Sequence, residues 1–191
     1  MNTTEILRLV RTATATGQHC RAQSEHAFAQ LVAHYQGPLF GFLGRMGFAQ
    51  AQAEDLAQES FLRAWRHLHN YDAQRAEFST WLFSIARNLA LNEWKRAAHQ
   101  NEVWEGHAPA DAASTAPTPP ELLERKQQQA QLQAALALLA VADRCVLALA
   151  YISELDMASI ARIEACSLAA VKTRLYRARQ RLLEILEKPH A

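Results

Sequence analysis

The chain has 191 residues, half of them apolar, and a formal net charge of +1. That length suffices for one or two small domains with hydrophobic cores, and the composition is that of a folded protein rather than a disordered one. The sequence contains no run approaching the ~20 uncharged apolar residues of a membrane-spanning helix.

The N-terminus and the cysteines both indicate a cytoplasmic protein. Charged residues interrupt the first 20 residues, which lack the apolar stretch of a signal peptide. The three cysteines are odd in number and widely spaced, which argues against a disulfide framework and for a reducing compartment. We therefore expect a cytoplasmic location.

A proline-rich segment divides the chain. Four of the six prolines lie between Pro109 and Pro120, in the sequence GHAPADAASTAPTPPE, whose small polar residues are typical of a linker. We expect an N-terminal extension and two domains separated by this linker, with the following bounds: extension 1–23, first domain 24–99, linker 100–120 and second domain 121–191.

Apolar residues recur at helical spacing on both sides of the linker, whereas β-branched residues are sparse and alternating runs are short. We expect an all-α fold of two small helical domains joined by a flexible Pro-rich linker. The predicted helices span residues 24–35, 38–47, 51–69 and 78–98 before the linker, and 121–139, 142–152, 156–163 and 167–187 after it.

The helix that contains EDLAQESFLRAWRHLH (residues 54–69) has one broad apolar face, which we expect to be core. A separate stripe at i, i+4, i+7 and i+11 consists of Asp55, Glu59, Leu62 and Arg66. This stripe is either a solvated surface with one stray leucine or a docking surface anchored by Leu62.

The next helix, FSTWLFSIARNLALNEWKR, carries two apolar faces with basic residues beside them. Two such faces indicate a helix wedged between neighbours; the alternative is an aromatic and basic surface that stacks on unpaired bases. Lys95 and Arg96 at its end either contact phosphates or complement the helix dipole.

Five cations crowd into SLAAVKTRLYRARQRL (residues 167–182), although the chain as a whole is almost neutral. A short helix capped by Asp156 precedes this one, which begins at Ser167, and the break between them has three or four residues. Small and polar side chains occupy the outer face, with cations at its flanks. This pattern predicts a helix-turn-helix, which reads base edges and contacts phosphates; a solvated basic helix or a coiled coil is the alternative.

The motifs ESFLRAWRHL, FSTWLFSIARNLALNEWKR and AAVKTRLYRARQRL, in this order around a Pro-rich linker, resemble the extracytoplasmic-function (ECF) group of bacterial RNA polymerase sigma factors. The resemblance covers roughly residues 25–187. It implies an alternative sigma factor that binds core polymerase, recognises −35 and −10 type promoter elements and helps to open the DNA. It also implies an anti-sigma partner, often membrane-anchored in this group.

The resemblance also implies roles for individual residues. The stripe Asp55, Glu59, Leu62 and Arg66 would bind the polymerase. The downstream promoter element would be contacted by Asn70, Tyr71, Asp72, Arg87, Asn88, Lys95 and Arg96, with the first three near an unstacked base. The upstream element would be contacted by Lys172, Thr173, Tyr176 and Arg177, with Arg174 and Arg179 on phosphates, and Arg177 is the best candidate for a guanine contact.

The sequence departs from the family pattern at the helix-turn-helix. Ala165 and Glu154 stand where the family often has glycine, so a left-handed backbone there costs roughly 1 kcal/mol or more. Glu164 occupies the place of a usual core leucine, and Ala170 that of a frequent threonine.

Two other functions remain open from the residues alone. A stand-alone helix-turn-helix regulator with an N-terminal interaction domain would bind duplex DNA without polymerase. An enzyme or metal sensor is disfavoured, because the sequence has no Cys-x-x-Cys, His-Glu-x-x-His or Gly-rich phosphate motif. We expect no cofactor, no metal, no small-molecule substrate and no catalytic residue.

Overall fold

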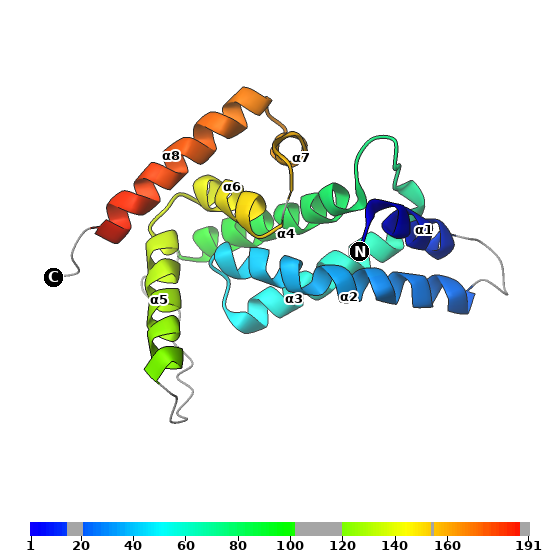
Figure 1. The fold of residues 1–191 in the computed structure, drawn as a ribbon, viewed down its shortest axis with the longest axis horizontal. Helices are drawn as coiled ribbons and strands as arrows, with labels where there is room; N and C mark the ends of the chain where they lie inside the picture. Colours follow the sequence, from blue (N-terminus) through cyan, green and yellow to red (C-terminus); the bar gives the residue numbers. More distant parts are fainter. Residues whose placement is uncertain (15–20, 102–119, 154, 188–191) are drawn as a thin grey trace.

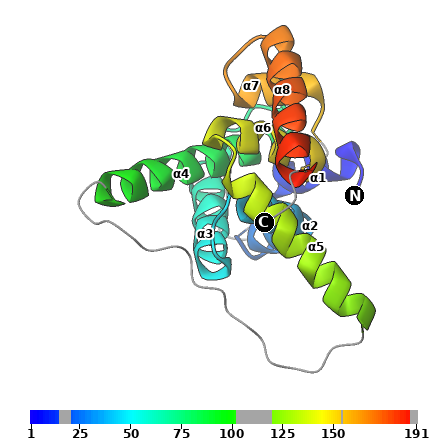
Figure 2. The ribbon, with the colours of Figure 1, turned by 90° about the vertical axis from the view of Figure 1, so that its left-hand side faces the viewer.

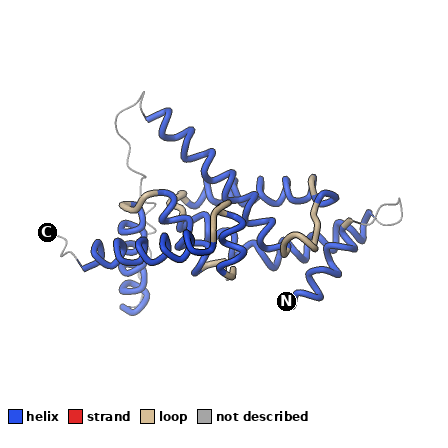
Figure 3. Tube along the Cα trace, turned by 90° about the horizontal axis from the view of Figure 1, so that it is seen from above, coloured by secondary structure: helices blue, strands red, loops and turns tan. Residues whose placement is uncertain are grey.

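The computed structural model describes residues 1–14, 21–101, 120–153 and 155–187. These residues form eight α-helices and one 3₁₀ turn and contain no strand, which confirms the expected all-α fold (Figure 3). The helices are α1 (Thr3–Ala13), α2 (Arg21–Arg45), α3 (Gln50–Arg66), α4 (Phe78–Asn101), α5 (Pro120–Ala137), α6 (Val141–Tyr151), α7 (Met157–Ile163) and α8 (Leu168–Glu187), with η1 at Leu68–Asn70.

Helices α2, α3 and α4 pack together as a first unit, with α1 lying against α2 (Figure 1). The two helices expected at 24–35 and 38–47 are one continuous helix, although Pro38 lies inside it. Proline removes one backbone hydrogen bond. The apolar positions on either side of it, including Leu31, Leu39 and Phe42, are fully buried at helical spacing, and this packing keeps the helix continuous.

Helix α1 was not among the helices expected from the sequence. Its first turn is capped by Asn2, whose side chain accepts a hydrogen bond from the Glu5 amide (2.8 Å). Leu9 and Val10 are buried against α2. The extension expected at residues 1–23 therefore adds to the core of the first unit.

Helices α5 to α8 form a second unit, in which α8 packs on α5, α6 and α7. Both predicted caps are confirmed: Asp156 accepts from the Ser159 amide (2.7 Å) and Ser167 from the Ala170 amide (3.2 Å). Between these two helices Ala165 has a φ of +51°, so the left-handed turn expected here is made without glycine.

The two units touch each other within the described residues, because α4 packs on α7 and α2 on α6. Figure 2 shows α6, α7 and α8 gathered over the α4 side of the first unit. The linker predicted at 100–120 lies almost wholly outside the described residues. The division into two domains at that linker therefore stays a prediction.

Candidate protein- and nucleic-acid-binding surfaces

An apolar groove runs along the outer side of α2 and α3. One part, of about 530 Å³, is lined by Phe28 and Val32 of α2 and by Phe61, Leu62 and Trp65 of α3. A second part, of about 510 Å³, shares Val32 and Phe61 with the first and continues towards Phe40. The groove gives Leu62 an extended apolar surface beside it.

The predicted docking stripe lies on the exposed side of α3, next to this groove. Leu62 is 48% exposed, and Asp55 and Arg66 are also exposed. Glu59 is partly buried and accepts a hydrogen bond from Arg63 Nε at 2.6 Å. The sequence reasoning missed the α2 wall of the groove, whose signal was the i, i+4 spacing of Phe28 and Val32.

The segment between α3 and α4 is held by an aromatic cluster. Tyr71 packs on Phe78 and Trp81, with ring centroids 5.7 and 5.3 Å away, and its hydroxyl donates to the carbonyl of Ala76 (3.0 Å). Burial raises the pKa of Tyr71 to about 12, and the carboxylates of Glu77 and Asp72 add to the shift. The two polar neighbours in the predicted base pocket, Asn70 and Asp72, precede and follow Tyr71 in the chain and are exposed.

The residues predicted along the single strand divide into two groups on α4. Asn88, Lys95 and Arg96 are exposed, and Arg96 pairs with Glu93 (2.9 Å). Arg87 is instead largely buried, with its side chain 19% exposed and its Nε donating to Glu164 of the second unit at 2.6 Å.

The outer face of α8 forms a polar hollow of about 420 Å³. Thr173, Arg174 and Arg177 line it together with Arg181 of α8 and Asp143 of α6, which accepts a hydrogen bond from Arg181. Tyr176 is 64% exposed and Arg177 is also exposed, so neither side chain is buried in the protein's own core. A helix that binds the DNA major groove requires such exposure. The sequence reasoning missed Asp143, which lies 38 residues before its partner Arg181 and carries no periodic signal.

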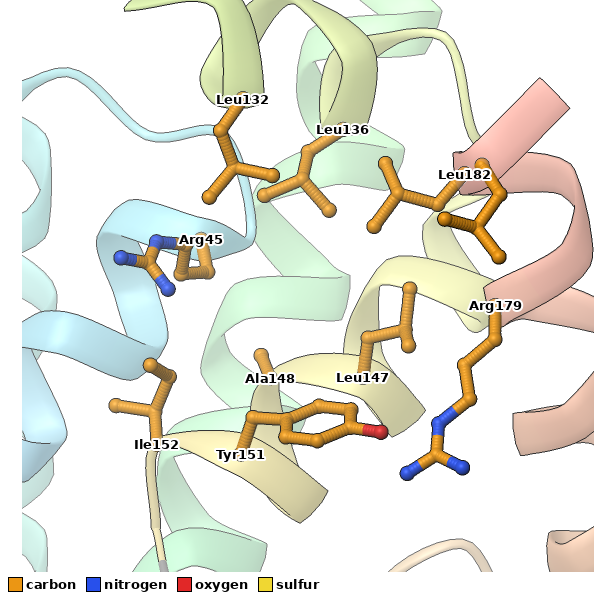
Figure 4. A pocket seen from close by; sticks show the side chains of 10 residues that line it. Arg45, Leu132, Leu136, Leu147, Ala148, Tyr151, Ile152, Arg179 and Leu182 are labelled. Atoms are coloured by element: carbon orange, nitrogen blue, oxygen red, sulfur yellow. The ribbon is translucent and has the colours of Figure 1, made fainter. Parts of the chain in front are cut away.

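Lys172 and Arg179 lie on another side of α8. The guanidinium of Arg179 covers the ring of Tyr151 at 5.0 Å from the centroid. Arg179 and Tyr151 border a second apolar groove, of about 360 Å³, where leucines of α5, α6 and α8 meet Arg45 and Ile152 (Figure 4). The structure thus brings Thr173, Arg174 and Arg177 together but places Arg179 in a different hollow.

Glu164 lies between the two units, at the end of α7. Its side chain is 2% exposed, so a carboxylate is buried at the place where the family pattern has a core leucine. Besides Arg87, it accepts hydrogen bonds from Arg174 (3.0 Å) and from the Cys145 thiol (3.3 Å). Burial and the nearby Glu164 carboxylate raise the pKa of the Cys145 thiol, so this cysteine is a buried, protonated side chain at neutral pH.

The described residues contain no helix with the length and apolarity needed to cross a bilayer. Nor do they contain a group of three or more histidine, cysteine, aspartate or glutamate side chains placed to hold a metal ion.

Two family descriptions match the two units. Residues 31–100 match Sigma-70 region 2, which covers most of α2 to α4, and residues 129–182 match Sigma-70 region 4, which covers most of α5 to α8. The second match thus contains α7 and most of α8, and the first contains the α3 wall of the α2–α3 groove.

Among curated proteins, the chain is 30% identical to the ECF RNA polymerase sigma factor RpoE of Cereibacter sphaeroides over 84% of this chain and 86% of that protein. It is also 30% identical to the sigma factor SigW of Bacillus subtilis, over 83% and 88% of the two chains. Among solved structures, the fold is shared by the sigma factor RpoE of Bartonella quintana, which was crystallised with the anti-sigma factor NepR. The two superpose with a TM-score of 0.68 at 22% identity, over 85% of this chain and 98% of that one.

The same fold occurs in CnrH, solved with the cytosolic domain of CnrY, with a TM-score of 0.67 at 24% identity over 98% of this chain and 99% of that one. The two family matches and the full-length relatives do not favour a stand-alone regulator. The chain belongs to the extracytoplasmic-function group of RNA polymerase sigma factors, and it is an alternative sigma factor for transcription initiation.

Proposed function

We propose that three surfaces of this sigma factor divide its work. The α3 stripe and the α2–α3 groove bind core polymerase, the η1–α4 region binds the downstream promoter element, and α8 binds the upstream element. The observation that carries the proposal is the hollow on α8, which Thr173, Arg174 and Arg177 line with Thr173 and Arg177 exposed, at the surface that a helix-turn-helix presents to the major groove.

The polymerase contact is supported by the surroundings of Leu62. An exposed leucine at the edge of an apolar groove, flanked by Asp55, Glu59 and Arg66, has the apolar centre and charged rim of a protein interface. A partner helix that buries Leu62 would also cover Phe61 and Trp65. This contact would anchor the sigma factor on the enzyme.

The downstream contact is supported by the aromatic cluster behind Tyr71. Unstacking a base costs a few kcal/mol, which a pocket for that base partly offsets. Asn70 and Asp72 offer hydrogen-bonding groups beside an aromatic wall that is already ordered. Asn88, Lys95 and Arg96 then extend a polar and basic path along α4, and Arg87 joins it when its guanidinium is released from Glu164.

The upstream contact rests on α8. Arg177 presents two donors that suit the O6 and N7 acceptors of guanine, and Thr173 and Tyr176 contact neighbouring bases. Arg174 binds phosphate, as do Lys172 and Arg179 from the side of the helix that faces Tyr151. Each phosphate contact adds affinity that declines with salt, because binding releases counterions.

We further propose that the protein acts in the cytoplasm, without a catalytic site of its own, and that an anti-sigma factor holds it inactive. The related sigma factor RpoE of Bartonella quintana was solved in such a complex. An inhibitor that fills the α2–α3 groove would block the surface proposed for the polymerase, and the groove around Leu132, Leu136 and Leu182 offers it a second apolar contact. Such an inhibitor is either soluble or carried by a membrane protein.

Reconstitution with bacterial core polymerase tests the proposal. Genomic DNA is transcribed by core polymerase with and without this protein, and the 5′ ends of the transcripts are sequenced. We expect new start sites that share one upstream and one downstream element. Unchanged start sites, together with tight binding of the free protein to duplex DNA, would contradict the proposal.

A further inference from the structure

The Glu164 carboxylate joins the two units at the place where their proposed DNA surfaces approach each other. It comes from the end of α7, and α7 packs on α4 of the first unit. With its side chain only 2% exposed, it lies among donors rather than in solvent.

The donors on Glu164 come from both DNA surfaces. Arg87 Nε of α4 donates to Oε1 at 2.6 Å, and Arg174 Nη1 of α8 donates to Oε2 at 3.0 Å. Two guanidinium groups on the two oxygens of one anion make a charge-assisted arrangement of the kind that Arg residues form with a phosphate. The Cys145 thiol completes the site by donating to Oε1 at 3.3 Å.

While Arg87 is bound to Glu164, it is not available to DNA. Its side chain is 19% exposed, and the Nε donor that would serve a phosphate is already used by Glu164. Arg174 keeps 40% of its side chain exposed and is therefore less restricted. A DNA strand that binds along α4 must therefore displace Glu164 before it can contact Arg87.

The contact between the units, which includes buried apolar residues of both, also buries a charge on α6. Arg144 of α6 is 5% exposed, and the described residues supply no carboxylate to pair with it. Burial without such a partner lowers its pKa, and its Nε has no hydrogen-bond acceptor in the described part of the chain. Its Nη1 instead donates to the carbonyl of Met46, a neutral partner, so the ion pair that joins the units here is the one between Glu164 and Arg87.

We propose that Glu164 is an intramolecular clasp, which holds the two units together in the free protein and competes with promoter DNA for Arg87 and Arg174. Opening the clasp frees Arg87 for the downstream strand and lets the second unit move to the upstream element. The proposal rests on the assignment of these arginines to DNA in the proposed function. It assigns Glu164 a role in setting when the DNA surfaces are available.

The test compares the full-length wild-type protein with Glu164→Gln, which removes the charge at nearly constant size, and with Glu164→Leu, which also removes the hydrogen bonds. Far-ultraviolet circular dichroism first establishes that each variant is as helical as the wild type. Small-angle X-ray scattering then gives the radius of gyration of the free protein. We expect a larger radius for both variants, because removing the carboxylate leaves Arg87 buried without its counter-charge.

The second measurement is fluorescence anisotropy with a single-stranded oligonucleotide that carries the non-template sequence of a start site mapped as above. We expect the Glu164 variants to bind about fivefold or more tightly than the wild type, the range of a typical coupling between two sites. Arg87→Ala should expand the protein as well but bring no gain in affinity, because the contact itself is lost. Glu184→Gln, which removes the same charge from an exposed site on α8, should leave the radius unchanged.

Two results would overturn the clasp. An unchanged radius for both Glu164 variants would mean that this carboxylate does not hold the units together. A larger radius without tighter binding of the oligonucleotide would mean that the closed arrangement does not mask the strand surface. The scattering result needs no polymerase and no promoter, so a failure of the proposed function would be distinguishable from a failure of the clasp.

Discussion

The guanidinium of Arg144 on α6 lies over the indole ring of Trp94 on α4, with its Cζ 4.7 Å from the ring centroid. Both side chains donate to one acceptor, the carbonyl of Met46 just beyond the end of α2, at 3.1 Å and 3.2 Å. The cation and the helix end are complementary, because the last carbonyls of a helix carry partial negative charge. Like the Glu164 site, this three-way contact joins the two units.

The contact leaves no room for a side chain at Gly47. Its φ is +93°, and a Cβ there would collide with Nη1 of Arg144. We expect Gly47→Ala to lower the free energy of unfolding by about 1–3 kcal/mol, as overpacking does. Gly44→Ala is the matched control, since a Cβ at Gly44 meets nothing within 4 Å, and it should be neutral or stabilising. Equal melting temperatures for the two variants would contradict this account of the contact.

Ala165 offers the opposite case. Its left-handed φ of +51° strains an alanine but suits a glycine. Ala165→Gly should therefore stabilise the protein by about 1 kcal/mol, measured by urea unfolding followed at 222 nm. Ala33→Gly, at an exposed position inside α2, should instead destabilise by about 1 kcal/mol. Destabilisation by both changes would show that the turn is not strained.

Leu62 separates binding from folding. We expect Leu62→Glu to abolish binding to core polymerase, because the charge cannot be buried in an apolar interface. It should leave the melting temperature nearly unchanged, since the side chain is 48% exposed. Co-elution with core polymerase in gel filtration measures the first effect. Leu138→Glu, at a leucine that is 72% exposed and outside the groove, should bind normally; equal binding by both variants would argue against the stripe.

The aromatic cluster around Tyr71 gives a prediction at alkaline pH. Burial raises the pKa of both Tyr35 and Tyr71 from 10.0 to about 12. The unfolded chain therefore loses these protons first, so the free energy of unfolding is unaffected below pH 10 and falls as the pH rises towards 12. Tyr71→Phe should make this fall shallower. Urea unfolding at a series of pH values measures it, and a fall equally steep in the variant would contradict the burial of Tyr71.

Local patterns in the sequence predicted much of the fold. Helical periodicity placed every helix from α3 onward to within about three residues, and the caps at Asp156 and Ser167 were readable from single residues. The pattern failed where tertiary packing outweighed a local signal: the core around Leu39 continues α2 through Pro38. It also missed α1, because a short helix with a single apolar stripe depends on α2 to bury it.

The candidate surfaces were predictable only in part, for a related reason. The exposure of Leu62, Tyr176 and Arg177 follows from the period of one helix. The partners of Arg87 and Arg181 do not, because Glu164 and Asp143 lie far away in the chain and are brought near by the packing of several helices. The exposure of residues on one helix follows from sequence periodicity, whereas a contact between distant helices leaves no periodic signal in the sequence.

The division of promoter recognition between the two units is tested most directly with a library of promoters randomised at both elements. Wild-type protein, Arg177→Ala and Asp72→Ala are each reconstituted with core polymerase, and the sequences of the transcribed promoters are compared. We expect Arg177→Ala to relax preference at one upstream base pair, by roughly 1–3 kcal/mol, and Asp72→Ala to change the downstream element alone. Unchanged preferences in both variants, or a change by both in the same element, would contradict the assignment of one promoter element to each unit.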